Sequence, residues 1–161
     1  MFGFFKEKSF KEEFEDKTNS IVSLAFEYVK NDKKNVDAIY IYGSNEEGFL
    51  YYDCFYCIND ILLERHRIND TGQSYDVSDN IQLRYIKHAN QDLRNLIDIF
   101  KKYKKEPPTQ VKMEYYPKTG KFDCHLDYDM HYSNKKNGTP DETAELWFEE
   151  LRVISRNNIN G

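Results

Sequence analysis

The feature that most constrains the fold of this chain is a pair of strand-like runs separated by a loop too short for a crossover. Residues 37–42 (DAIYIY) and 49–58 (FLYYDCFYCI) are rich in β-branched and aromatic side chains, which favour strands. The loop between them, residues 43–48, is much shorter than the roughly dozen residues that a parallel connection needs. The two runs are therefore predicted to pair as antiparallel strands.

The rest of the chain alternates between the helical and the strand period. A third strand is predicted at 61–68, and a hairpin at 109–132 turns on the Pro-Lys-Thr-Gly sequence of residues 117–120. Apolar residues spaced by three and four predict helices over 10–30, 80–104 and 140–155. We predict a single domain over residues 1–161, of the α+β class, with an antiparallel sheet of about five strands and three helices in the order α-β-β-β-α-β-β-α.

Charge and hydropathy exclude several classes of protein. The 161 residues include 28 acidic and 23 basic side chains, a formal charge of −5, whereas nucleic-acid and anionic-lipid binders are normally basic. Charges at Lys6, Glu7 and Lys8 interrupt the N-terminal apolar stretch before it reaches the length of a secretory signal. We therefore expect a cytoplasmic protein with no membrane partner and no direct contact with nucleic acid.

The last predicted strand carries the most informative polar pattern. If it is extended throughout, its period of two places Asp123, His125, Asp127, Asp129 and His131 on one face. The opposite face is then apolar and suited to the core. Residues 122–150 contain eight acidic and two basic residues, so the acidity of the chain is concentrated in this region.

Three interpretations of this acidic face remain open. It is a solvated surface, a docking face for a basic partner, or a metal site of the kind a metal-dependent hydrolase would use, since Asp and His are suitable ligands. Alternate side chains of one strand are about 6.6 Å apart at their bases, and metal sites usually draw ligands from several elements. We therefore predict no metal and no cofactor.

The three cysteines do not form a reactive site. Cys54 and Cys57 match the C-x-x-C spacing, but positions i and i+3 of a strand point to opposite faces. Cys124 falls on the apolar side of its own strand, so all three are predicted to be reduced, small packing residues. No nucleophile is placed with a base, and we expect the protein not to be an enzyme.

Tyrosine is the second informative residue type, with 13 copies. Because several lie next to each other in the predicted strands, some must face away from the core. Tyrosine is enriched at protein interfaces, where it offers contact area and a polar tip. Tyr116, on the strand next to the acidic one, is a candidate aromatic anchor. A tyrosine-rich face that closes a homodimer is the alternative.

Once the order of elements is set, the sequence resembles the YezG-like family of bacterial immunity proteins, or antitoxins. The resemblance spans roughly residues 20–151 and departs from the family pattern at Pro108, where an aromatic residue is frequent, and in a longer third strand followed by a loop around Gly72. The similar segments are residues 38–42 (AIYIY), 48–53 (GFLYYD), the helix ending near Tyr103, 106–109 (EPPT), 120–123 (GKFD) and 127–129 (DYD).

The resemblance implies a small acidic cytoplasmic protein that binds the C-terminal toxic domain of a secreted polymorphic toxin, often a nuclease. A nuclease domain is basic because it holds phosphates, so an acidic face could occlude its active-site cleft. The family supplies no contact residues. Strand alternation alone makes the candidate toxin-binding residues Asp123, His125, Asp127, Asp129, His131 and Tyr116.

Overall fold

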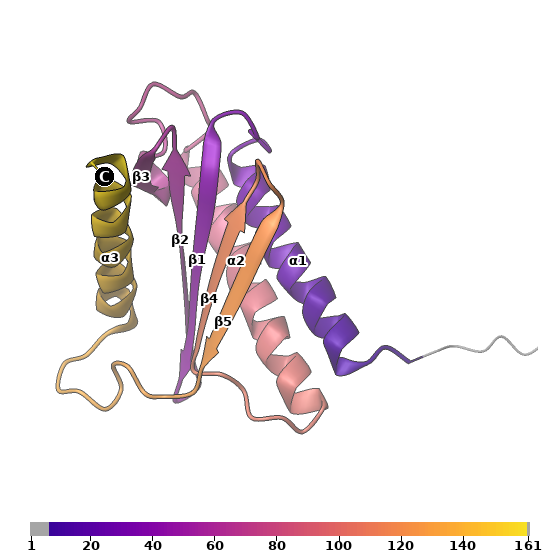
Figure 1. The fold of residues 1–161 in the computed structure, drawn as a ribbon. Coiled ribbons are helices and arrows are strands. Elements are labelled where there is room, and N and C mark those ends of the chain that lie inside the picture. The colour runs from indigo at the N-terminus through magenta and orange to yellow at the C-terminus, as the bar shows by residue number, and fades with distance from the viewer. Residues whose placement is uncertain (1–6, 161) are drawn as a thin grey trace, which may run out of the picture.

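Three helices and a five-stranded antiparallel sheet make up the computed structural model, which describes residues 7–160 (Figure 1). This confirms the predicted α+β class and order of elements. Residues 1–6 and 161 of the predicted single domain lie outside the described part. The elements are α1 (Phe10–Tyr28), β1 (Val36–Glu46), β2 (Phe49–Ile58), β3 (Ile61–Glu64), a 3-10 turn (Arg65–Arg67), α2 (Asp79–Lys102), β4 (Gln110–Tyr116), β5 (Lys121–Asp127) and α3 (Pro140–Asn160).

The strands lie in the order β3-β2-β1-β4-β5, so the long β1 is central. β1 pairs with β2 through a two-residue turn in which Glu47 and Gly48 both have positive φ, and it pairs on its other side with β4. β4 and β5 form the predicted second hairpin. Every neighbouring pair is antiparallel, as short connections require.

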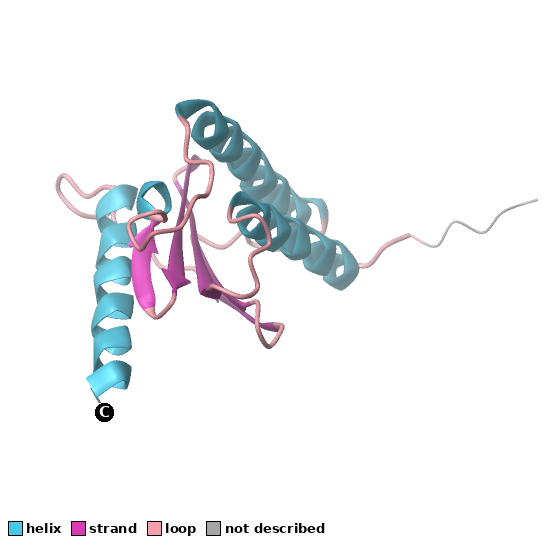
Figure 2. Cartoon of the chain, turned by 90° about the horizontal axis from the view of Figure 1, so that it is seen from above, coloured by secondary structure: helices cyan, strands magenta, loops and turns pink. Residues whose placement is uncertain are grey.

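One face of the sheet, called here the inner face, is covered by α1 and α2 (Figure 2). The two helices pack against each other and bury the apolar stripe that the helical spacing of α2 predicts, including Leu93, Leu96 and Phe100. From the strands, Ile39, Ile41 and other alternate residues point into the same core. This is the larger of the two apolar clusters.

The other face, called here the outer face, is covered only in part by α3. The helix packs on β2 and β3 at one side of the sheet (Figure 1). Its buried stripe is Ala144, Trp147 and Leu151, and the Trp147 ring meets Phe55 and Tyr40 at centroid distances of 6.0 and 5.9 Å. The second, smaller core therefore lies under α3 alone.

β1 is longer than the sequence predicts, because residues 43–46 belong to the strand and not to a loop. Gly43 needs no loop conformation there. A Cβ at this position would lie 2.9 Å from Leu93 Cδ1, so glycine leaves room for the Leu93 side chain where α2 packs closely on the sheet. The loop is reduced to the turn at Glu47 and Gly48.

The third strand is shorter than the predicted 61–68. It ends at Glu64, the last residue that pairs with β2, and a 3-10 turn over Arg65–Arg67 follows. The Tyr28 hydroxyl donates to the Arg65 carbonyl at 3.1 Å, and Ile68 is fully buried just after the turn. Contacts with α1 and the core thus replace the expected strand pairing.

Candidate protein-binding face

The side chains of β4 and β5 on the outer face lie beyond the part that α3 covers. The register places Glu114 beside Asp123 and Lys112 beside His125, with Tyr40 of β1 next to Glu114 on the other side. We call this surface the open face. It consists of Tyr40, Lys112, Glu114, Tyr116, Lys121, Asp123, His125 and Asp127.

The structure confirms the predicted alternation within β5. Phe122, Cys124 and Leu126 pack against the inner core, so Asp123, His125 and Asp127 lie on the opposite face. Tyr116 lies on the same face at the neighbouring strand, as expected. Because α1 and α2 cover the inner face, the charged side chains of β5 need no internal partners.

The open face is mixed in charge, which the count over residues 122–150 did not reveal. Lys121 lies 3.6 Å from Asp123, and Lys112 Nζ lies 5.1 Å from the centre of the Trp147 ring. Both lysines come from outside that window. This surface therefore carries three carboxylates and two ammonium groups, a mixture suited to selective rather than general attraction.

The tyrosines of the open face keep their hydroxyl protons at neutral pH. Burial raises the pKa of Tyr40 to about 12. Burial also raises the pKa of Tyr116, and the carboxylate of Glu114, to which its hydroxyl donates at 2.9 Å, raises it further. Both rings therefore present contact area with a neutral hydroxyl, and Glu114 fixes the orientation of the Tyr116 hydroxyl.

Asp129 and His131 do not continue this face, which corrects the predicted strand over residues 121–132. β5 ends at Asp127 because its partner β4 begins at Gln110, directly after Pro107, Pro108 and Thr109. Asp129 is exposed and His131 half-buried in the following loop. Tyr128 and Met130, expected on the apolar side, are about half exposed (46% and 45%).

The loop after β5 still holds these residues near Asp127. The Asp129 amide donates to the Asp127 carboxylate at 2.8 Å, and His131 Nε2 lies 3.3 Å from it. The Asp129 amide, more than His131, holds the pKa of Asp127 below its usual range. Asp129 and His131 thus lie next to the open face, at the end of β5, and do not continue the line of outward side chains formed by Asp123, His125 and Asp127.

Glu46 fixes the course of this loop. Its carboxylate is 1% exposed and accepts backbone N–H groups of His131, Tyr132 and Ser133 at 3.0–3.3 Å, and the Ser133 hydroxyl at 2.7 Å. Burial raises the pKa of Glu46, but these hydrogen bonds outweigh it, so the pKa lies below its ordinary value. The chain is thereby turned away from the strand direction.

Sequence reasoning missed Glu46 because it falls in a stretch predicted as loop, and its partners lie far along the chain. It also missed Lys112 and Glu114. Their place beside His125 and Asp123 follows from the register of the predicted β4–β5 hairpin, so that signal was present.

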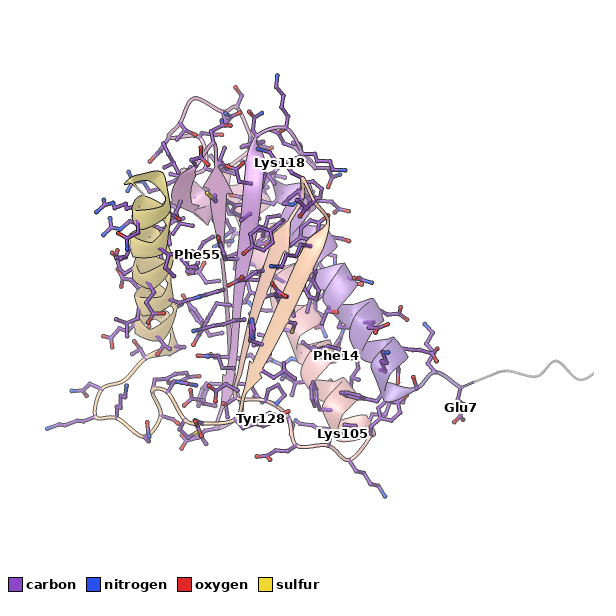
Figure 3. All side chains as sticks on the ribbon, in the orientation of Figure 1. Glu7, Phe14, Phe55, Lys105, Lys118 and Tyr128 are labelled. Atoms are coloured by element: carbon purple, nitrogen blue, oxygen red, sulfur yellow. The ribbon has the colours of Figure 1, made fainter. Side chains whose placement is uncertain are left out.

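A pocket of about 270 Å³ lies at the other side of the sheet, between α3 and the strands β2 and β3. Burial raises the pKa of Asp53 within it, although the Cys54 amide and the Tyr51 hydroxyl donate to this carboxylate at 2.8 and 3.3 Å. Figure 3 shows Phe55 at this side of the molecule. The lining residues are Tyr51, Asp53, Phe55, Glu64, Arg65, His66, Asp141, Glu145 and Phe148. Four separate elements supply them (β2, β3, the 3-10 turn and α3), so no local motif predicts the pocket.

The cysteines lie as the alternation predicts. Cys54 is buried in the inner core and Cys57 under α3, on opposite faces of β2, and both are free thiols. Within residues 7–160 no three His, Cys, Asp or Glu side chains are grouped so that they could hold a metal ion. No helix of the same part of the chain is long and apolar enough to cross a membrane.

Comparison of the chain with protein-family models and with curated proteins finds no match in either.

Proposed function

We propose that this chain is an immunity protein that binds a cognate bacterial toxin domain and neutralises it without turnover. The observation that carries the proposal is the open face. It combines the half-buried rings of Tyr40 and Tyr116 with ordered charges, and α3 reaches it only at its border, where Trp147 meets Tyr40 and Lys112. Interfaces favour this combination because aromatic rings bury area at low entropic cost while the charges around them select the partner.

The partner proposed is a basic domain of the nuclease type. A nuclease must carry positive charge to hold phosphates. Asp123, Asp127 and Asp129 would meet that charge at one side of the open face. Such complementarity raises the association rate and fixes the orientation of the complex.

Neutralisation is proposed to occur by occlusion of the basic cleft. Tyr116 would act as the aromatic anchor, because it lies on the open face at the turn between β4 and β5 and its hydroxyl is already oriented by Glu114. The sequence resemblance to the YezG-like immunity proteins supports the same function. The alternative within this proposal is that the protein binds beside the cleft and blocks the substrate indirectly. A structure of the complex would distinguish this from direct occlusion.

Co-expression with the toxin domain encoded by the adjacent gene tests the proposal. We expect growth to be rescued and the two proteins to co-purify as a complex that salt weakens. Tyr116→Ala should weaken the complex about tenfold, as loss of an interfacial anchor does. The control is Leu83→Ala, which removes an exposed side chain (70%) from α2 on the other side of the sheet.

An expressed and active toxin that neither binds nor is inhibited would overturn the proposal. Equal binding by the Tyr116→Ala and Leu83→Ala variants would contradict the place assigned to the open face, because only the first variant changes that face.

A further inference from the structure

β5 is an edge strand whose residues are nowhere fully buried. It has one neighbour in the sheet, β4 (Figure 1). Its inward residues Phe122, Cys124 and Leu126 are only half-buried, in contrast to Val111 and Met113 of β4. The opposite edge strand, β3, has only four residues and is packed against α3. The sheet therefore offers one long edge on which another strand could pair.

An apolar hollow lies beside the end of this edge. It is about 510 Å³ and is lined largely by aromatic rings of α1 and α2 together with Leu126 and Tyr128. Figure 3 shows Phe14, Lys105 and Tyr128 gathered at the end of β5. A strand added to β5 would extend the inner face and cover part of this hollow.

The sequence of β5, Lys-Phe-Asp-Cys-His-Leu-Asp, is complementary to itself when reversed. In an antiparallel pair, residues directly opposite each other point to the same face of the sheet. Two copies of β5 keep their apolar residues on one face only if residues of the same parity are opposite each other. The twofold axis that relates the copies must therefore pass midway between two facing copies of the same residue.

Charge then selects which residue lies on that axis. With the axis at Cys124, Lys121 faces Asp127, Asp123 faces His125 and Phe122 faces Leu126. If the axis is moved to Asp123, the Asp123 carboxylates of the two copies face each other. If it is moved to His125, Asp123 of each copy faces Asp127 of the other. Opposite charges across a strand pair stabilise it and like charges destabilise it. Of these three axes, only the one at Cys124 pairs the whole strand, places Lys121 opposite Asp127 and leaves no carboxylate opposite another carboxylate. Asp123 then faces the His125 imidazole, which can donate a hydrogen bond to it.

We infer that a second copy of this chain binds along β5 in antiparallel orientation, with the twofold axis at Cys124, so that one sheet runs through both protomers. The pairs Lys121–Asp127 and Asp123–His125 each occur twice across the axis. On the inner face, Phe122 of each copy covers Leu126 of the other beside the apolar hollow. The open faces of the two copies then form one continuous surface.

Sedimentation or light scattering of the full chain measures the association directly. We expect a mass twice the 19.3 kDa of the chain. Asp123→Lys and His125→Asp should each weaken the dimer about tenfold, because the first removes both Asp123–His125 pairs and the second places two carboxylate–carboxylate pairs across the axis. An equimolar mixture of the two variants should dimerise again, since the lysine introduced in one copy then faces the aspartate introduced in the other. The second pair of that mixed dimer is the native one, Asp123 facing His125.

These variants spare the fold. Among the described residues the side chain of Asp123 has one polar contact, at 3.6 Å to Lys121, and His125 is exposed. Circular dichroism checks that they remain folded. A wild-type chain that stays monomeric at about 1 mM would overturn the inference, as would single variants that dimerise like the wild type. A mixture that fails to restore the dimer would overturn it too.

Cys124 supplies an independent measurement. Opposite residues of an antiparallel pair have Cα atoms about 4.5–5.5 Å apart, within the range of a disulfide. Diamide, which accepts the two electrons and two protons of the thiols, should cross-link the chain into a covalent dimer, and Cys124→Ser should abolish this product. A cross-linked dimer that persists in Cys124→Ser would contradict the axis. None of these measurements involves a toxin, so their failure leaves the proposed function to its own test.

Discussion

The two faces of the sheet are built from the same strands but are closed to different extents. The inner face meets two helices and forms a continuous core, in which Ile39, Tyr56 and Leu96 have no exposed surface. The outer face meets a single helix, α3, and the loop that binds Glu46, and its core ends at Trp147, where the open face begins. Because successive side chains of a strand point to opposite faces of the sheet, each strand contributes residues to both faces. The number of helices on each side decides which side is a core and which is a surface free for contacts.

The largest effect is expected where the inner face is closed most tightly. Leu96→Ala should lower the free energy of unfolding by about 4 kcal/mol, because the side chain is fully buried between α2 and the sheet and the site cannot collapse. Leu83→Ala on the same helix is the control and should cost less than about 0.5 kcal/mol. Denaturant unfolding measures both, and similar losses would contradict the comparison.

Trp147→Ala tests whether the outer core unfolds separately. The ring joins α3 to Tyr40 and Phe55, so its loss should cost about 3 kcal/mol. Hydrogen exchange should then show faster exchange of the α3 amides while those of α2 keep their protection. Equal loss of protection in both helices would mean that the two faces form one cooperative unit.

Glu46→Gln should cost about 2 kcal/mol, because three amides and a hydroxyl lose a charged acceptor. The native pKa of Glu46 lies below the ordinary 4.5. Its contribution is therefore complete above pH 4.5 and is lost as the pH falls through the lower native value. Unfolding measured between pH 7 and pH 3 should show a weaker dependence on pH in the variant. An unchanged dependence would contradict this role.

The smallest effect on stability is expected at exposed aspartates. Asp129→Lys, at the end of the open face, and Asp98→Lys, on the exposed side of α2, make the same charge change on opposite sides of the sheet. Both should change stability by less than about 0.5 kcal/mol. Under the proposed function only Asp129→Lys should slow association with the toxin domain at low salt, as stopped-flow mixing would measure.

The sequence predicted those parts of the fold that local patterns determine. The α2 stripe and the alternation of residues 37–42 and 49–58 needed no distant contact, and the strands formed there. Gly43 was assigned to a loop because the close approach of the Leu93 side chain, which favours a small residue within the strand, has no local signal.

The candidate site divides in the same way. Alternation placed Asp123, His125 and Asp127 on one face, because all three lie in a paired strand. It failed for Asp129 and His131, since Glu46, more than 80 residues earlier, binds the backbone at that point. How far α3 covers the outer face depends on tertiary packing, and no periodicity within one element encodes it.

The attachment of the loop to Glu46 also has a statistical consequence for α3. A free segment from Asp127 to Pro140 would explore many end-to-end separations before the helix reached the sheet. Fixing residues 131–133 roughly halves the length of flexible chain before α3. This reduces the entropic part of the free-energy cost of docking α3 by about 0.6 kcal/mol. Glu46 thus raises the local concentration of α3 at its docking position, in the manner of a shortened tether.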